Sequence, residues 1–137
     1  MKIRLEAYNP DWVGDFERIR SELTALIGFL DPHIEHIGST SVKGLSAKPI
    51  IDVLVGVDSE SDLDSVVAPL TKFDYVYYEV YNAVMPYRRL FVKHKTKPQS
   101  LSVPTTITHE KEAPISTEEH NQRLAHVHII LQNSPHF

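Results

Sequence analysis

A glycine turn followed by an aspartate within an apolar strand is the pattern in this sequence best suited to chemistry. Ile37-Gly38-Ser39 begins a loop that ends at Pro49, and Asp52 lies in the apolar run that follows. A tight glycine turn lets backbone amides and hydroxyls approach phosphate oxygens, and an aspartate on the adjoining strand can hold a bridging Mg²⁺. The pattern therefore favours metal-assisted binding of a phosphate chain.

The spacing of Gly38-Ser39 and Asp52 is typical of nucleotidyltransferases, but the second acid that these enzymes carry is missing. Nucleotidyltransferases carry a second acid two residues after the first, where strand alternation puts both carboxylates on one face to grip the metal. Leu54 occupies that position here. The spacing alone leaves an alternative open, in which Gly38-Ser39 is only a turn at a strand end and Asp52 is a buried acid paired with Lys48 or an arginine.

Histidine is the other residue type available for metal or proton chemistry, because the chain has eight histidines and no cysteine. His126 and His128 alternate along an apolar strand and so face the same side. With Asp52 they would form a ligand set suited to Zn²⁺, Mn²⁺ or Fe²⁺ and poorly suited to Mg²⁺. The alternative is a solvated or hydrogen-bonded pair. His36, just before the turn, could contact a phosphate, polarise Asp52, or make a structural hydrogen bond.

Basic side chains near this pattern are candidates for holding phosphate. Arg89 and Lys93 are expected on one face of a strand, where an arginine could clamp a phosphate with two parallel hydrogen bonds. The alternative is a solvated edge strand guarded by cations. Lys48 could bind phosphate or simply pair with Asp52.

The elements that must position these residues follow from periodicity and from turn residues. Asn9-Pro10 predicts a helix start, and apolar residues at helical spacing from Trp12 to Leu30 predict a long amphipathic helix. The remaining expected elements are strands at 3–8, 33–37, 50–57, 75–81, 88–94 and 125–131, a helix from 58 to about 70, and a flexible loop over 96–121 with a possible edge strand at 101–108.

Composition narrows the class of protein further. A chain of 137 residues with 42% apolar residues fits one compact domain. The net charge of −4 argues against general nucleic-acid binding. The charged N-terminus lacks a signal-peptide core and no apolar run could cross a membrane, so we expect a cytoplasmic protein without membrane association.

The run from Glu35 to Asp52 closely resembles the signature of the GrpB family. The resemblance extends to Tyr8-Asn9-Pro10-Asp11-Trp12, to Arg88-Arg89-Leu90-Phe91-Val92-Lys93, and to Arg123 with His126-Val127-His128. It implies an α+β fold, with a mixed sheet and packed helices of the polymerase-β nucleotidyltransferase type, over a single domain spanning 1–137.

The resemblance also implies a nucleotide site. The expected phosphate-binding residues are Gly38, Ser39, Thr40, Ser41, Lys48, Arg89 and Lys93, and the expected metal ligands are Asp52, His126 and His128, with His36 in support. The metal would be Mg²⁺, Mn²⁺ or Zn²⁺, with Asp52 as the catalytic carboxylate. Three departures stand out: Lys43 replaces a usual proline, the 95–123 stretch is longer, and the family's helical tail is missing. The missing tail would expose an apolar surface and favour self-association.

Three functions remain open from sequence. The first is transfer of a nucleotidyl group from a nucleoside triphosphate to an unknown acceptor. The second is binding of a nucleotide or related metabolite without catalysis. The third is metal-dependent hydrolysis at Asp52, His126 and His128.

Overall fold

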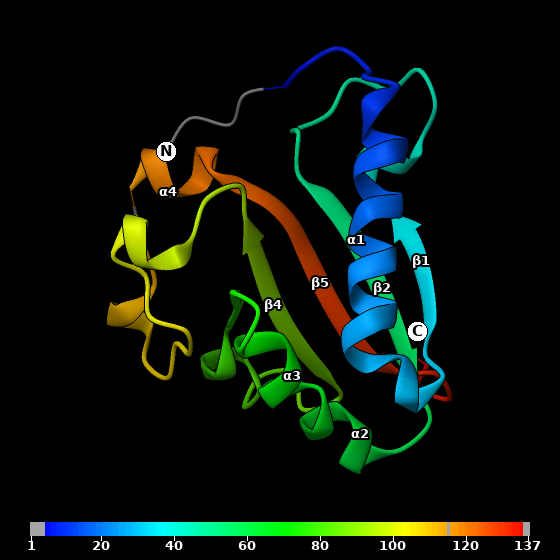
Figure 1. The fold of residues 1–137 in the computed structure, drawn as a ribbon, viewed down its shortest axis with the longest axis vertical. Coiled ribbons are helices and arrows are strands. Elements are labelled where there is room, and N and C mark those ends of the chain that lie inside the picture. The colour runs from blue at the N-terminus through cyan, green and yellow to red at the C-terminus, as the bar shows by residue number, and fades with distance from the viewer. Residues whose placement is uncertain (1–4, 115, 136–137) are drawn as a thin grey trace.

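The computed structural model describes residues 5–114 and 116–135, which form a mixed sheet with helices packed on it (Figure 1). The strands are β1 (His33–Ile37), β2 (Ile51–Val57), β3 (Tyr75–Tyr77), β4 (Arg88–His94) and β5 (Arg123–Leu131). The α-helices are α1 (Asp11–Ile27), α2 (Glu60–Ser65), α3 (Val67–Thr71) and α4 (Thr117–Asn121). The five strands lie in the order β1-β2-β5-β4-β3, with β2 and β5 parallel and the other neighbours antiparallel. The expected α+β class with a mixed sheet is confirmed.

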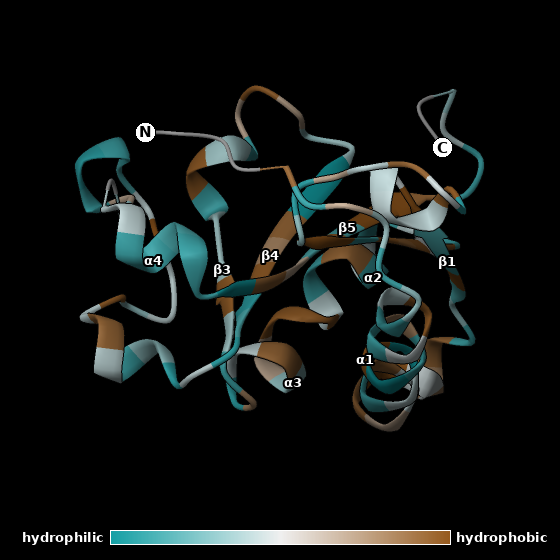
Figure 2. Cartoon of the chain, turned by 90° about the horizontal axis from the view of Figure 1, so that it is seen from above, coloured by the Kyte–Doolittle hydropathy of each residue, from teal (hydrophilic) through white to brown (hydrophobic). Residues whose placement is uncertain are grey.

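Helix α1 forms over most of the length that its sequence predicts, and the last expected residues form a 3₁₀ helix, Gly28–Leu30. The Asn9 side chain accepts a hydrogen bond from the Asp11 amide at 2.9 Å, which satisfies one free donor at the helix start. The apolar stripe of α1 is buried against the sheet at Trp12, Phe16, Ile19, Leu23 and Ile27. Burial of this stripe fixes α1 over one face of the sheet, on the same side as α3 (Figure 2).

Alternation along β2 divides its side chains between the two faces of the sheet. Ile51, Val53 and Val55 join the main core under α1. Asp52 and Leu54 therefore lie on the opposite face. The parallel register pairs Asp52 with His126 and Leu54 with His128, so the candidate residues share the face away from α1.

The segment 96–121 is a packed part of the fold, which corrects the expectation of a flexible loop. Val103 and Ile107 are buried in a second core with Val76, Tyr78 and Val92. This segment covers part of the sheet face that α1 leaves open. The edge strand considered for 101–108 is reduced to an isolated bridge between Tyr77 and Thr106.

Other elements are shorter than the sequence predicts. The helix expected from 58 to 70 begins at a Ser59–Asp62 capping box but divides into α2 and α3 around Val66. Pro69 accounts for the division, since it has no amide to bond the carbonyl four residues earlier. The strand expected at 75–81 ends at Tyr77, and the residues Glu79–Tyr81 form a 3₁₀ helix.

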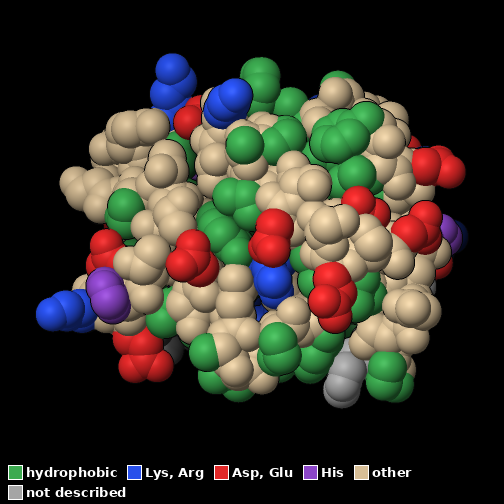
Figure 3. Space-filling view, turned by 90° about the horizontal axis from the view of Figure 1, so that it is seen from below, with side chains coloured by type: hydrophobic (Ala, Val, Ile, Leu, Met, Phe, Trp, Pro, Cys, Tyr) green, Lys and Arg blue, Asp and Glu red, His purple; other side chains and the backbone are tan. Residues whose placement is uncertain are grey.

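The ends of the sheet differ in character. The segment 5–8 contributes an isolated bridge between Glu6 and Ala47, not the expected strand, while residues 3 and 4 lie outside the described part. The bridge joins the N-terminal segment to the Gly38 loop, and both segments lie at the upper end of Figure 1. The opposite end, seen in Figure 3, carries acidic side chains spread over its surface. In the described ranges, no helix is both long and apolar enough to cross a membrane.

Candidate functional site

The Gly38 turn is shaped to bring the chain against Asp52. β1 ends at Ile37, and Gly38 follows with φ of +74°, a conformation that side-chain-bearing residues rarely adopt. A Cβ atom on Gly38 would lie 2.6 Å from Oδ2 of Asp52. The next residues form a 3₁₀ helix, Ser39–Ser41, and the Ser41 hydroxyl donates to the Gly38 carbonyl at 2.6 Å. The structure thus brings the glycine turn and Asp52 together.

Two side chains fix this turn from the side of α1. Thr40 is buried, and its Oγ1 lies 2.9 Å from Nε2 of His36. The His36 ring stacks on Phe16, with 4.8 Å between ring centroids. Burial lowers the pKa of His36, and the nearby Asp52 only partly opposes this. Of the three roles considered for His36, the structure shows the structural hydrogen bond.

Asp52, His126 and His128 lie together in partly exposed positions. Oδ1 of Asp52 is 3.7 Å from Nδ1 of His126 and 3.5 Å from Nε2 of His128. Burial raises the pKa of the Asp52 carboxyl, but the two facing imidazoles lower it by more, so the pKa lies well below its usual range. Asp52 is therefore a carboxylate at neutral pH.

Each imidazole also contacts an arginine on its other nitrogen. Nη1 of Arg123 donates to Nε2 of His126 at 3.1 Å, and Nη1 of Arg88 donates to Nδ1 of His128 at 3.3 Å. A guanidinium group can only donate, so these two imidazole nitrogens must accept. The N–H of each neutral ring is then on the nitrogen that faces Asp52.

This arrangement does not fit the predicted metal site. A metal beside Asp52 would need lone pairs on Nδ1 of His126 and Nε2 of His128, and these are the protonated nitrogens. Within residues 5–114 and 116–135, no group of three or more His, Asp or Glu side chains is placed to hold an ion. The metal ligands Asp52, His126 and His128 stay a prediction, and a bound metal would require both rings to change tautomer.

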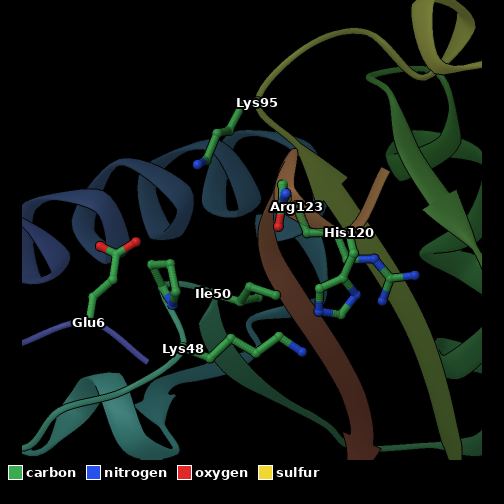
Figure 4. A pocket seen from close by; sticks show the side chains of 8 residues that line it. Glu6, Lys48, Ile50, Lys95, His120 and Arg123 are labelled. Carbon is green, nitrogen blue, oxygen red and sulfur yellow. The ribbon is translucent and has the colours of Figure 1, made fainter. Parts of the chain in front are cut away.

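A cationic pocket opens beside the Gly38 loop, and we call it the Lys48 pocket (Figure 4). Its volume is about 220 Å³ and its lining residues are Glu6, Lys48, Pro49, Ile50, Lys95, His120, Asn121 and Arg123. Lys48 extends toward His120 in this view. Burial lowers the pKa of Lys48, and the charge of Arg123 lowers it further against the opposing effect of Asp52. Crowding of cations costs energy here, which an anionic ligand would relieve.

Two further cavities lie on the same face of the sheet, and the first of them adjoins the Lys48 pocket. The Asp52 pocket, of about 260 Å³, shares Lys48 and Ile50 with the Lys48 pocket and is also lined by Leu5, Ser39, Thr40, Asp52 and His126. The Leu54 pocket, of about 430 Å³, is lined by Ile37, Leu54, Met85, Tyr87, Arg88, His128 and Ile130. The Lys48 pocket is thus cationic, the second pocket lies at Asp52, and the Leu54 pocket is largely apolar.

The structure does not bring Arg89 and Lys93 to this site. Arg89 donates to Asp64 at 3.0 Å and to two backbone carbonyls. Lys93 donates to the Phe73 carbonyl at 2.8 Å and lies 3.4 Å from Glu22 of α1. Both point to the helix-covered face, because β4 pairs Leu90 with His128 and so puts the odd-numbered residues of β4 on the other side.

Sequence reasoning missed four residues around the site: Arg88, Lys95, His120 and Arg123. Arg88 and Leu90 are two residues apart on β4, so their side chains lie on the same face of the sheet. The pairing of β4 with β5 shows that this is the face of His128, and the sequence alone does not give that pairing. Lys95 follows an irregularity at Lys93/His94, which breaks the simple alternation. His120 lies in the segment expected to be a loop, and Arg123 extends β5 two residues before its expected start.

The comparisons with known proteins agree with this fold. The chain is 27% identical to the solved GrpB protein of Enterococcus faecalis, with a TM-score of 0.69 over 97% of this chain and 64% of that one. It is 40% identical over 63 residues to glutamate-rich protein GrpB of Alkalihalophilus pseudofirmus, covering 46% of this chain and 36% of that one. A third match, 32% identical over 76 residues, covers 53% of this chain and 19% of a dephospho-CoA kinase of Mycolicibacterium paratuberculosis.

These matches span only part of each relative, well under half of the two curated proteins. The family model for the GrpB protein, in contrast, matches residues 2–137. It includes the Gly38 turn, Asp52, and the strand with His126 and His128. This chain belongs to the GrpB family.

Proposed function

We propose that this chain is a nucleotidyltransferase-like protein that binds a nucleoside triphosphate or a related phosphate ligand. The observation that carries the proposal is the Lys48 pocket, where Lys48, Lys95 and Arg123 line one cavity in a chain of net charge −4. Cations that gather in one pocket of a chain with negative net charge, beside a glycine turn, suit the binding of phosphate oxygens.

Residues of the Lys48 pocket and the Asp52 pocket would make different contacts with the ligand. Lys48 and Arg123 would balance phosphate charge, and Ser39 and Thr40 line the adjoining Asp52 pocket at the glycine turn. Burial, and the nearby cations Lys48 and Arg123, lower the pKa of His120, so this neutral ring can offer a hydrogen bond to the ligand. A ligand spanning these two pockets would carry several phosphate oxygens.

The Leu54 pocket supports a ligand larger than phosphate. Its apolar walls, with Tyr87 and Arg88 at the side, suit a planar base or another organic group. Leu54 contributes to this wall at the position where a nucleotidyltransferase would carry its second acid. The same residue thus removes a metal ligand and supplies an apolar contact, which favours binding over transfer.

One relative supports phosphate chemistry more broadly. A protein named dephospho-CoA kinase contains a segment similar to this chain, although that segment is about a fifth of its length. A kinase handles phosphate groups, so the occurrence of such a segment there accords with a phosphate-binding role. Its substrate and reaction are those of that protein.

Calorimetric titration with ATP and with adenosine tests the proposal. We expect ATP to bind and adenosine to bind at least ten-fold more weakly, because the phosphates supply the charged contacts. Equal affinity for both, or no binding of ATP, ADP or pyrophosphate, would contradict it. A parallel assay for pyrophosphate release with Mg²⁺ or Mn²⁺ distinguishes binding from nucleotidyl transfer, and release abolished by Asp52→Asn would favour the enzyme.

A further inference from the structure

The two histidines of the candidate site are held by arginines from two different strands. Arg123 begins β5 and donates to His126, while Arg88 begins β4 and donates to His128. Each contact lies within hydrogen-bond distance, at 3.1 and 3.3 Å. Both imidazoles are therefore occupied on the side away from Asp52.

Arg123 is itself held by a buried network. Its Nε donates to Oε2 of Glu119 at 2.9 Å, and the same oxygen lies 2.6 Å from Nε2 of His94. Its Nη2 donates to the Tyr78 hydroxyl at 3.2 Å. The side chains of Glu119 and His94 are 2% and 0% exposed, so this anchor is out of contact with water.

A continuous chain of contacts thus runs from α4 to Asp52. Glu119 orients Arg123, Arg123 fixes the tautomer of His126, and His126 directs its Nδ1–H toward Asp52. Moving Arg123 aside would leave Glu119 in a buried position with one charged partner fewer, which is costly. Displacing Arg123 to free the His126 lone pair is therefore unfavourable.

We propose that the Asp52 centre works without a metal, and that Arg123 and Arg88 are positioning residues that keep the N–H groups of His126 and His128 directed toward Asp52. Phosphate charge would then be balanced by Lys48 and Arg123, where a metal-dependent site uses a divalent ion. The statement about phosphate charge rests on the proposed function, which supplies the ligand. The statement about the tautomers of His126 and His128 does not rest on it.

The tautomers can be measured directly on the intact chain labelled with ¹⁵N-histidine. Long-range ¹H–¹⁵N spectra at pH 7.5 should show His126 protonated on Nδ1 and His128 protonated on Nε2. One equivalent of Zn²⁺ should leave both patterns unchanged. The opposite tautomer on either ring, or Zn²⁺ coordination by either ring, would overturn the proposal.

A variant of Arg88 tests whether the arginine is what excludes the metal. A glutamine side chain can donate or accept a hydrogen bond. In Arg88→Gln, His128 can therefore adopt the tautomer that has its proton on Nδ1 and its lone pair on Nε2, the nitrogen that faces Asp52. We expect this variant to bind Zn²⁺ at least ten-fold more tightly than the wild type, and Arg88→Lys, which can only donate, to stay like the wild type. Arg20→Gln, at an exposed arginine of α1, is the matched control. An affinity for Arg88→Gln no higher than that of the control would overturn the role given to Arg88.

Titration with ATP in EDTA and then in Mn²⁺ connects this inference to the ligand. Equal affinity in the two conditions supports a metal-free site. Binding only in Mn²⁺ would overturn the inference while leaving the proposed function intact. If ATP does not bind at all, the proposed function fails, and the tautomer measurement still decides the inference.

Discussion

His126 on β5 lies directly beside Asp52 on β2, in parallel register, with Nδ1 3.7 Å from Oδ1. The Gly38 turn approaches the other oxygen of the same carboxylate. Asp52 is thus enclosed by the turn on one side and by two imidazoles on the other.

The Gly38 turn gives the first prediction. Gly38→Ala should destabilise the fold by about 1–3 kcal/mol, because φ is +74° and the added Cβ would collide with Asp52. Gly14→Ala is the matched control: in α1 its Cβ meets only the Arg18 side chain at 3.7 Å, so it should stabilise by up to about 1 kcal/mol. Urea unfolding measures both, and a Gly38→Ala variant as stable as the wild type would refute the steric account.

The second prediction concerns Glu119. Burial raises the pKa of its carboxyl, but hydrogen bonds from His94 and Arg123 lower it by more, to below the ordinary value of 4.5. An acid with a lowered folded pKa contributes stability that is present above its unfolded pKa and is lost as the pH falls through the folded value. Glu119→Gln should therefore cost about 1–3 kcal/mol at pH 7. The difference from the wild type should narrow as the pH falls below 4.5.

Urea unfolding across a pH series from 7 down to 3 measures this effect. Glu118→Gln is the matched control, since Glu118 is the exposed neighbour on α4 and should change stability little at any of these pH values. A gap between the wild type and Glu119→Gln that stays constant over the series would show that the charge of Glu119 is not what stabilises the network.

The third prediction concerns Arg89 and Lys93, which are predicted from the sequence to bind phosphate and which the structure places on the helix-covered face of the sheet. Arg89→Leu and Lys93→Met should bind ATP within two-fold of the wild type, because Arg89 pairs with Asp64 and Lys93 with Glu22 on the helix-covered face. Calorimetry with ATP checks this. A loss of ten-fold or more in either variant would mean that the phosphate site is on the other side of the sheet.

The sequence predicts the main elements well where one physical signal dominates. The stripe from Trp12 to Ile27 predicts α1, and the lone carboxylate of an apolar run marks Asp52. For Arg88 and Arg89, the sequence does not predict which of the two side chains reaches the site. Adjacent residues on a strand face opposite sides, and only the pairing of β4 with β5 determines which of them reaches His128. The roles of Arg123 and His120 likewise depend on α4, within a segment whose sequence has no clear periodicity.

The affinity of the Lys48→Met variant for ATP tests the central claim most directly. Titration in EDTA of the wild type, Lys48→Met and Lys72→Met compares a pocket lysine with an exposed lysine following α3, both replaced by a side chain of similar length. Loss of a charged contact to phosphate should weaken binding about ten-fold or more in Lys48→Met, with Lys72→Met like the wild type. Lys48→Met that binds ATP as tightly as the wild type would contradict the assignment of the Lys48 pocket as the phosphate site.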